Sequence, residues 1–346
     1  MNKLTVVIPH FNGIDILSDC LNALYQNKFA DFVCVVIDNG SNDGSQDFIK
    51  KEFKQVKLIE NKENLGYAGA CNQGIEISGT PFVLLLNNDT AMPENFLQEM
   101  LKAIEQDEQI SMVQPKILSI QNKDSFDYSG AAGGELDIFG YPFARGRVFD
   151  EVEKDNEQYD SLKDTCFWTS GCALLLRKKV TDEIGMLDED FFAHQEEIDL
   201  NWRAQLAGYR NIVTTKTYIY HYSGYTLRKD NQHKMYLNHR NNLIMMIKNY
   251  SWPHLVILFP MRIFMELLTI VADSILWDRK RSKAVIQSLI YIIKNLGTIL
   301  GKRREIQKLR RVKDSAIVKN MYCRSIIWDH FILKKTPNDC ISLFRK

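Results

Sequence analysis

Short apolar runs alternate with stretches of helical periodicity between residues 4 and 86, and this alternation restricts the possible folds more than any other feature. The runs have the length of buried strands, which we predict at residues 4–8, 32–37, 56–60 and 82–86. Apolar residues at helical spacing predict helices at residues 14–25, 45–53 and 68–77. Strands and helices in alternation are typical of an α/β fold with a mostly parallel sheet.

Polar clusters follow three of the predicted strands, at residues 9–12, 38–45 and 87–89. The carboxyl ends of neighbouring parallel strands meet at one edge of a sheet, and ligands bind there. Strand-ending loops are also polar simply because they lie at the surface, which is the alternative explanation. Carboxylates and amides at three neighbouring strand ends favour a shared binding crevice.

The sequence pattern becomes mixed after residue 110. Residues 129–146 are rich in glycine and aromatic residues, which predicts loops and short strands. An apolar strand is predicted at residues 172–176 and a helix at residues 196–206. Two further short strands are predicted at residues 212–214 and 218–220.

The net charge of +1 conceals two oppositely charged parts of the chain. Residues 1–225 hold 20 Lys and Arg against 35 Asp and Glu, a balance of −15. Residues 226–346 hold 24 against 8, a balance of +16. A basic part of this kind indicates an anionic partner, either nucleic acid or anionic lipid.

Residues 252–277 are strongly apolar but contain Arg262, Glu266 and Asp273. Because charges are costly at the centre of a membrane, we predict helices that lie in the bilayer interface and do not span it. A second apolar helix is predicted at residues 284–300, followed by a basic run at residues 302–313. This combination favours an anionic membrane surface. The alternative is that the helices pack on the rest of the protein and the basic run is solvated.

Two features argue against export of the chain. The apolar run at residues 4–8 is too short for a signal peptide and ends at Pro9. The seven cysteines are odd in number and form no CxxC pair, which indicates reduced thiols in a cytoplasmic protein.

Four segments carry a resemblance to a known family. They are residues 6–12 (VVIPHFN), 36–44 (VIDNGSNDG), 63–72 (ENLGYAGACN) and 84–90 (LLLNNDT). In this order, each near the end of a predicted strand or the start of a helix, they resemble family 2 glycosyltransferases of the GT-A fold, and in particular the bacterial rhamnosyltransferase-like branch. The resemblance covers about residues 3–250. It implies a catalytic domain at residues 1–225 and an α-helical, basic, membrane-associated appendage at residues 226–346.

The resemblance also implies a site for a nucleotide-sugar donor. Asp38 would accept a hydrogen bond from the base or ribose, and Arg240 would brace the diphosphate. The remaining donor-binding residues are expected to be Pro9, Phe11, Asn12, Asn64, Gly66, Asn72, Asn87 and Asn88. The alternatives are a helix-capping Asp38, turn packing at Gly66 and a solvent-facing Arg240.

A divalent cation, Mg²⁺ or Mn²⁺, is expected at Asp89, with His221 as a further ligand. Departing phosphate requires a counter-charge, and one carboxylate suffices when phosphate oxygens and water complete the shell. Asn87 contributes only a neutral carbonyl, so we expect the metal to bind together with the nucleotide. The alternatives are an Asx turn at the strand end and an interior histidine.

Residues 191–203 (FFAHQEEIDLNWR) resemble the family's acidic catalytic segment. Glu197 takes the place of the general base, which in the family is usually Asp, and Glu196 supports it. Asp199 is expected on the acceptor side, together with Trp168, Ser170 and Gly171. Alternatively, the carboxylates complement the helix dipole and the tryptophan is an interior residue.

The predicted function is transfer with inversion of a hexose or deoxyhexose from a pyrimidine nucleotide sugar, dTDP-rhamnose or a UDP-sugar. The expected acceptor is a lipid-linked glycan at the inner face of the cytoplasmic membrane. Nucleic acid is not expected as a partner, because it would not explain the paired carboxylates. The oligomeric state is not predicted. A catalytically inactive, nucleotide-sugar-binding scaffold is the alternative, since Asn87 and Glu197 depart from the commonest pattern.

Overall fold

The computed structural model describes residues 2–222, 231–276 and 279–345. Its first four strands are parallel and lie in the order β3-β2-β1-β4. They are β1 (Leu4–His10), β2 (Phe32–Asp38), β3 (Lys57–Glu60) and β4 (Phe82–Leu86). In this register His10 pairs with Asp38, so the polar residues that end β1 and β2 meet at one edge. The predicted α/β class and these four strands are confirmed.

Beyond β4 the sheet is mixed rather than parallel. The strand β12 (Ala173–Arg177) is antiparallel to both β4 and β6 (Ile110–Ser119). The residues predicted as two short strands form one strand, β13 (Arg210–His221), which is parallel to β6 and interrupted by a register shift between Thr214 and Tyr218. Two-residue strands, β5 (Thr90–Ala91) and β11 (Thr165–Cys166), pair with β13.

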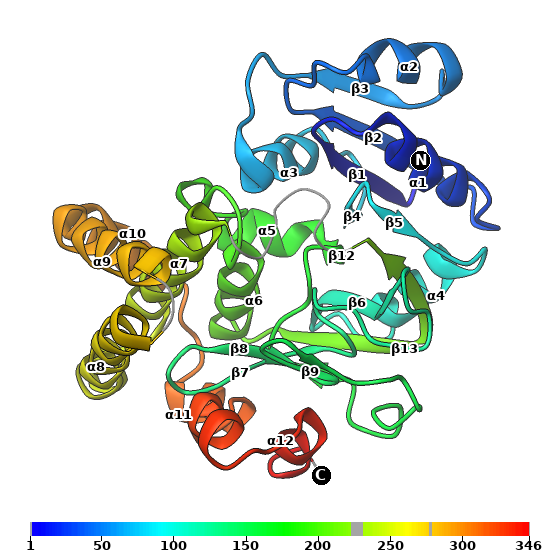
Figure 1. Ribbon diagram of the computed structural model, residues 1–346. Coiled ribbons are helices and arrows are strands. Elements are labelled where there is room, and N and C mark those ends of the chain that lie inside the picture. Colours follow the sequence, from blue (N-terminus) through cyan, green and yellow to red (C-terminus); the bar gives the residue numbers. More distant parts are fainter. Residues whose placement is uncertain (1, 223–230, 277–278, 346) are drawn as a thin grey trace.

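Helices cover both faces of the large sheet, because alternate residues of each central strand are apolar on both sides (Figure 1). On β1, Val6 and Ile8 face one cluster and Val7 faces the other. The first cluster includes α1 (Ile14–Tyr25), α2 (Ser45–Glu52) and α4 (Phe96–Glu105). The second includes α3 (Gly66–Glu76), α5 (Lys178–Ile184) and α6 (Glu196–Leu206).

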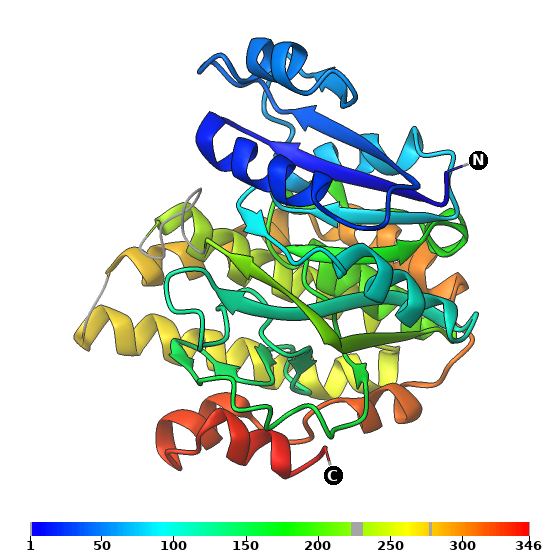
Figure 2. The ribbon, with the colours of Figure 1, turned by 90° about the vertical axis from the view of Figure 1, so that its right-hand side faces the viewer.

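A small antiparallel sheet lies at the opposite end of the molecule from β3, next to the C-terminal segment (Figures 1 and 2). Its strands are β7 (Gly134–Leu136), β8 (Pro142–Ala144), β9 (Arg147–Val148) and β10 (Glu151–Val152). Residues Tyr322, Ile326 and Cys340 of the C-terminal segment share a buried cluster with this sheet. The segment contains α11 (Asp314–Ile317), η2 (Val318–Asn320), η3 (Trp328–Ile332) and α12 (Pro337–Ser342).

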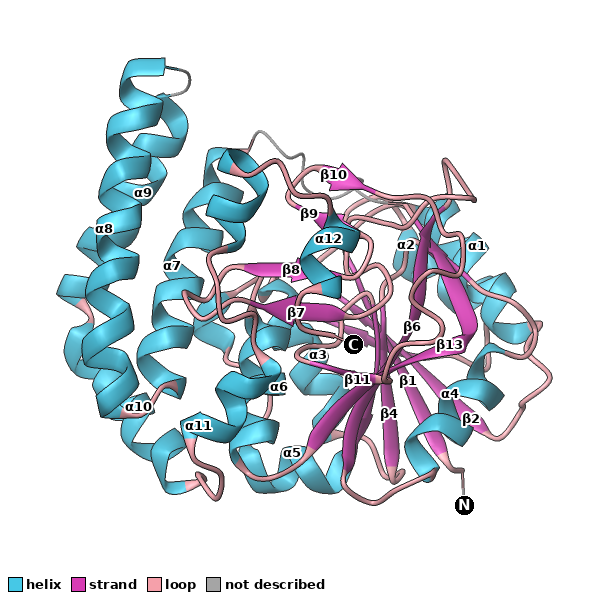
Figure 3. Cartoon of the chain, turned by 90° about the horizontal axis from the view of Figure 1, so that it is seen from below, coloured by secondary structure: helices cyan, strands magenta, loops and turns pink. Residues whose placement is uncertain are grey.

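Four helices form a layer beside α6 (Figure 3). They are α7 (Gln232–Asn249), α8 (Trp252–Leu276), α9 (Arg279–Lys294) and α10 (Leu296–Lys308). The single helix predicted at residues 284–300 is wrong, since α9 and α10 meet there at an angle of 73°. The predicted domain boundary at residue 225 lies outside the described residues. Apolar side chains of α7 to α10 share one cluster with Leu136 and Trp202, so this layer packs directly on the rest of the protein.

Several basic residues of the run at residues 302–313 contact the rest of the protein. Lys302 lies 2.5 Å from a carboxylate oxygen of Asp190, and Arg311 lies 2.6 Å from one of Glu183. The buried Arg303 donates to the carbonyl oxygens of Ile247, in the last turn of α7, and of Tyr250, which follows α7. These contacts hold α10 and the following loop in place, while Arg304, Lys308 and Lys313 are exposed.

Candidate active site

A pocket of 520 Å³ lies at the ends of β1, β2, β4 and β13, where the strand-end clusters were predicted to converge. Asp89 and Glu197 both line it, although they are far apart in the sequence. The predicted residues in its wall are Pro9, Phe11, Asn64, Gly66, Asn87, Asn88, Asp89, Trp168, Ser170, Gly171, Glu196, Glu197 and His221. The predicted residues Asn12, Asp38, Asn72, Asp199 and Arg240 are not among its lining residues.

Asp38 is fully buried and directly precedes Asn39 in the sequence, a residue that lines the pocket. One oxygen, Oδ2, accepts hydrogen bonds from the Gln46 amide at 2.6 Å and the Ser41 main-chain N–H at 3.1 Å. The other, Oδ1, is buried and accepts no hydrogen bond from the described residues. Its neighbour Asn39 lines the pocket and donates to Asn64 Oδ1, which fixes the turn before α3.

Asn12 and Asn72 have structural contacts in place of the predicted donor contacts. Asn12 Oδ1 accepts a hydrogen bond from the main-chain N–H of Asn42, which ties two strand-end loops together. The Asn72 amide is buried and bonds both the N–H and the carbonyl oxygen of Leu187. These bonds connect α3 to the turn that precedes α6 and explain why Asn72 points away from the pocket.

His221 links the strand-end carboxylate Asp89 to a second acid, Asp127. The ring atoms Nε2 and Nδ1 lie 3.2 Å from Asp89 Oδ1 and 3.0 Å from Asp127 Oδ1. Although burial opposes protonation, the two carboxylates raise the pKa of His221. Asp127 thereby fixes the orientation of the imidazole. The sequence pattern did not predict Asp127 as a site residue.

The residues around Asp89 fit a divalent cation that is shared with a diphosphate. A carboxylate, an imidazole and the side-chain carbonyl oxygen of the nearby Asn87 provide suitable donor atoms; the amide group of Asn87 lies 3.4 Å from His221 Nε2. The described residues contain no group of three His, Cys, Asp or Glu side chains placed to hold a metal ion. Phosphate oxygens and water would therefore have to complete the coordination shell.

The turn before α6 is strained. Phe192, His194 and Gln195 all have positive φ angles, of 63°, 69° and 73°, which cost free energy for residues other than glycine. Gly66 allows the close approach of this turn to α3, since a Cβ there would lie 2.5 Å from the Phe192 carbonyl oxygen. The strain lies directly before Glu196 and Glu197, which begin α6.

Two side chains of α7 hold the strained turn. Asn241 is buried and donates to the carbonyl oxygens of Phe191, Ala193 and His194. Arg240 donates to Asp190 and Phe191 carbonyl oxygens and packs on the ring of Tyr291 at 4.9 Å. Arg240 thus supports the strained turn before α6. It was predicted to bind the donor diphosphate instead.

Glu196 and Glu197 form a pair of interacting carboxyl groups in the pocket wall. Burial raises the pKa of both groups, and the charge of Glu197 raises that of Glu196 further. Each has one oxygen, Oε2, that is buried and has no hydrogen-bond partner within residues 2–222, 231–276 and 279–345. Both carboxyl groups therefore keep their protons to a higher pH than exposed glutamates do.

The loop at residues 168–171 forms part of the pocket wall. Trp168 is almost fully buried and its indole N–H donates to the Glu135 carbonyl oxygen. Ser170 is also buried, and its hydroxyl donates to the Ser129 carbonyl oxygen. Tyr67 donates to the Gly171 carbonyl oxygen at 2.6 Å, so this loop is fastened to α3. Only part of the Trp168 ring is presented to the pocket.

Asp199 lies behind the pocket rather than in its wall. It is fully buried, and its oxygens accept hydrogen bonds from Arg203 at 2.9 Å and Lys248 at 3.0 Å. Asn249 donates to its other oxygen at 2.8 Å. These bonds connect α6 with α7, so the contacts of Asp199 are structural.

The sequence analysis missed two residues of the pocket wall, Arg147 and His194. Arg147 of β9 lines the pocket, is only 7% exposed and packs on the Tyr128 ring at 4.6 Å. Its Nε is buried and has no hydrogen-bond partner among the described residues. His194 also lines the pocket, and burial together with the charge of Lys234 lowers its pKa to about 4. A lone arginine and a histidine carry no sequence signal for such a position.

A sheet with helices on both faces, and a pocket of carboxylates, amides and one imidazole at its strand ends, is typical of α/β proteins whose ligands bind at the carboxyl ends of the strands. Residues 5–185 match glycosyl transferase family 2, and the chain belongs to that family. The predicted resemblance is confirmed.

Curated relatives match over about three fifths of the chain. A poly-beta-1,6-N-acetyl-D-glucosamine synthase of Staphylococcus aureus is 25% identical over 212 residues, 61% of this chain and 47% of the synthase. The chain thus spans about half the length of that relative. An N-acetylglucosaminyl-diphospho-decaprenol L-rhamnosyltransferase of Mycobacterium tuberculosis is 23% identical over 235 residues, 63% of this chain and 75% of the relative.

Solved structures share the fold. The mannosyltransferase PcManGT of Pyrobaculum calidifontis, in complex with GDP-Man and Mn²⁺, matches with a TM-score of 0.52 and 14% identity over 92% of this chain and 86% of that one. Residues 1–349 of S. aureus TarS match with a TM-score of 0.54 and 15% identity over 93% of both chains. At these identities the likeness shows the fold alone, which is the predicted GT-A arrangement.

Proposed function

We propose that the protein is an inverting glycosyltransferase that acts on a nucleotide-sugar donor in cell-surface polysaccharide synthesis. The observation that carries this proposal is that Asp89 and Glu197 share one pocket. Membership of glycosyl transferase family 2 supports the reaction class. The names of the two curated relatives, a polysaccharide synthase and a lipid-diphosphate rhamnosyltransferase, support the pathway.

Glu197 is the proposed general base. It accepts the proton of the acceptor hydroxyl, whose oxygen then forms a bond to the anomeric carbon. The bond between the anomeric carbon and the phosphate oxygen breaks, and the nucleoside diphosphate leaves with the electron pair. The raised pKa of Glu197 makes it a stronger base than an exposed glutamate, and proton transfer of this kind contributes about 10²–10⁴-fold to a rate.

The donor end of the pocket is formed by the residues that end β1, β2 and β4. We propose a pyrimidine nucleotide sugar, dTDP-rhamnose or a UDP-sugar, with the free Oδ1 of Asp38 accepting from the base or ribose. Asp89, Asn87 and His221 would hold Mg²⁺ or Mn²⁺. When bound, such an ion would supply positive charge to the leaving diphosphate.

The proposed acceptor is a glycan linked to a lipid through a phosphate or diphosphate. Arg147 supports this choice, because a guanidinium in the pocket wall with no carboxylate partner among the described residues requires an anion from a ligand. A lipid-linked acceptor would bring the protein to the inner face of the cytoplasmic membrane.

A panel of nucleotide sugars tests the proposal. Calorimetry with and without Mn²⁺ identifies the donor, and release of the nucleoside diphosphate measures hydrolysis. We expect Glu197→Gln to bind the chosen donor as tightly as the wild type but to lose at least about a hundredfold in turnover. Binding of the donor without turnover by the wild-type protein, with every acceptor tried, would instead indicate a catalytically inactive scaffold.

A further inference from the structure

The outer surface of α8 is apolar over its whole length. Within the described residues α8 is the helix long and apolar enough to cross a membrane by itself, yet only 17% of it is buried. Its large apolar side chains that are about half exposed or more are Trp252, Val256, Ile257, Met261, Phe264, Leu267, Leu268, Val271 and Ile275. A surface helix in water would have its apolar residues buried and its polar residues outside.

The charged residues of α8 lie on its inner face. Arg262 and Glu266 are fully buried, and Asp273 is 7% exposed. The Arg262 guanidinium donates to Glu266 at 3.1 Å and to Asn242 of α7 at 2.6 Å, and it packs on the Tyr141 ring at 3.7 Å. The polarity of α8 is therefore inverted, with its charges paired inside the protein and its apolar residues outside.

Basic residues stand at one end of this apolar surface. Where α8 meets α9, Arg279, Lys280, Arg281 and Lys283 are exposed. Arg281 lies 3.6 Å from Asp273, the nearest acid on α8. The helix α9 lies beside α8 (Figure 3) and has three exposed isoleucines, at positions 286, 290 and 293.

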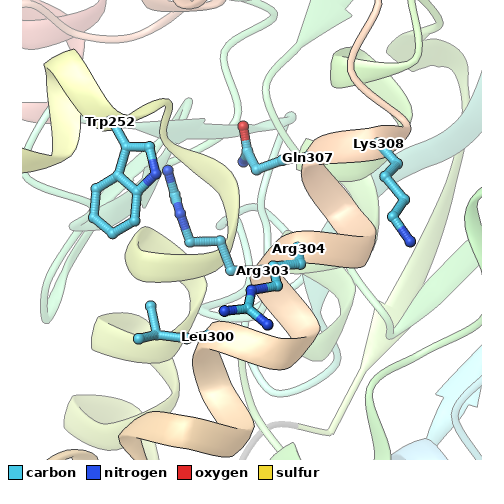
Figure 4. Close-up of a pocket in the computed structure, with 6 residues that line it drawn as sticks. All are labelled: Trp252, Leu300, Arg303, Arg304, Gln307 and Lys308. Carbon is cyan, nitrogen blue, oxygen red and sulfur yellow. The ribbon is translucent and has the colours of Figure 1, made fainter.

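The other end of the apolar surface carries a basic groove of 630 Å³ between α8 and α10. Figure 4 shows the Trp252 ring beside the guanidinium of Arg303, with Arg304 and Lys308 along α10. The Arg303 guanidinium lies 4.3 Å from the Trp252 ring, and its Nη2 is buried with no hydrogen-bond partner among the described residues. The exposed basic side chains of the groove, Arg304 and Lys308, thus lie near a half-exposed tryptophan.

We propose that the outer face of α8, with its basic ends, docks on a lipid bilayer that contains anionic phospholipids, the helix lying parallel to the membrane surface. An apolar face favours insertion among acyl chains, and basic residues at both ends favour phosphate headgroups. The helix does not span the bilayer in this arrangement, since Arg262 and Glu266 hold its inner face against α7. This inference is independent of the catalytic proposal.

A second copy of the chain is the competing occupant. Residues 257, 261, 264, 268, 271 and 275 follow a spacing that would also suit a pair of helices. The exposed apolar area is wider than such a single stripe, because Val256, Leu267 and the isoleucines of α9 belong to it. Like-charged residues at both ends favour an anionic surface over an identical chain.

Vesicle binding by the full-length protein tests this proposal. We expect the wild type to sediment with vesicles of phosphatidylcholine and phosphatidylglycerol, and less with phosphatidylcholine alone. The triple variant Ile257→Gln, Phe264→Gln, Val271→Gln should lose at least about tenfold in partitioning to both. Arg279→Gln with Lys283→Gln should lose about tenfold on the anionic vesicles only. Ile77→Gln, an exposed isoleucine after α3, is the matched control and should bind as the wild type.

Two results would overturn the docking proposal. One is equal vesicle binding by the triple variant and the wild type, with both folded by circular dichroism. The other is a wild-type dimer in light scattering that the triple substitution converts to monomers, without any vesicle binding. Donor hydrolysis in the absence of lipid should remain unchanged in all variants, which separates this result from any failure of the catalytic proposal.

Discussion

The side-chain amide of Asn241 donates a 2.7 Å hydrogen bond to the main-chain carbonyl oxygen of His194. Through this bond and two others, a residue of α7 holds the strained turn from which Glu196 and Glu197 project. Through these bonds α7 positions the turn that carries the proposed catalytic carboxylates.

Asn241→Ala should therefore lower kcat by about tenfold or more, because the turn loses three hydrogen bonds to Asn241 and relaxes. Asn249→Ala is the matched control, since Asn249 is a buried asparagine on the same helix that bonds Asp199 and not the turn. Both variants should lose stability in urea, but only Asn241→Ala should lose turnover. Equal kcat values for the two variants would show that the turn keeps its shape without Asn241.

The pH dependence of activity should report the two glutamates. A base acts only when ionised, and the pKa of Glu197 is raised by burial, so kcat/KM should fall on the acid side at a higher pH than for an exposed glutamate. Glu196→Gln imitates the protonated acid and should keep this acid limb in place with activity within about tenfold. Glu197→Gln should lose the limb together with turnover. A profile that disappears in Glu196→Gln and survives in Glu197→Gln would exchange the two roles.

The recognition of an anionic acceptor should depend on Arg147. Hydrogen bonds to charged groups contribute about 1.5–3 kcal/mol, so Arg147→Ala should raise KM for a lipid-phosphate-linked acceptor by about ten- to a hundredfold. The KM for the donor should stay within about twofold, and Arg147→Lys should recover part of the loss because it retains the charge. An increase confined to the donor KM would place Arg147 at the donor diphosphate.

The sequence alone predicted the strands and helices whose bounds are marked by a local pattern. The strand at Phe82–Leu86 and the helices at Ile14–Tyr25 and Glu196–Leu206 agree with the predicted bounds, because each is marked by an apolar run or periodicity. The shared pocket of Asp89 and Glu197 followed from strand order and motif resemblance.

Contacts between distant segments were beyond the sequence pattern. The partner of Asn72, Leu187, is 115 residues away, and no local feature indicates that the amide turns toward it. Asp127, which holds His221, lies 94 residues before it. From the sequence, the charged residues of α8 argue against a membrane-spanning helix. A sequence does not show, however, which face of a helix the rest of the protein covers. In the structure Arg262 and Glu266 are buried, so their charges do not prevent the outer face of α8 from contacting a membrane.

The ammonium nitrogen of Lys248 lies 2.5 Å from a carboxylate oxygen of Asp188 and 3.0 Å from one of Asp199. Lys248→Met would leave two buried carboxylates short of a partner, so we expect a loss of about 3–5 kcal/mol in the free energy of unfolding. Lys308→Met is the control, because its ion pair with Glu305 is exposed and should contribute no more than about 1 kcal/mol.

The free energy of unfolding measured as a function of pH gives a second test of the same variant. Although burial opposes it, Lys248 and Lys302 lower the pKa of Asp188, so this carboxylate stabilises the fold above its ordinary pKa and loses that effect as the pH falls. Lys248→Met should therefore unfold with a shallower dependence on pH below about 4. If instead Lys248→Met left stability unchanged and raised KM for the acceptor, Asp199 would belong to the acceptor site, as its sequence context first indicated.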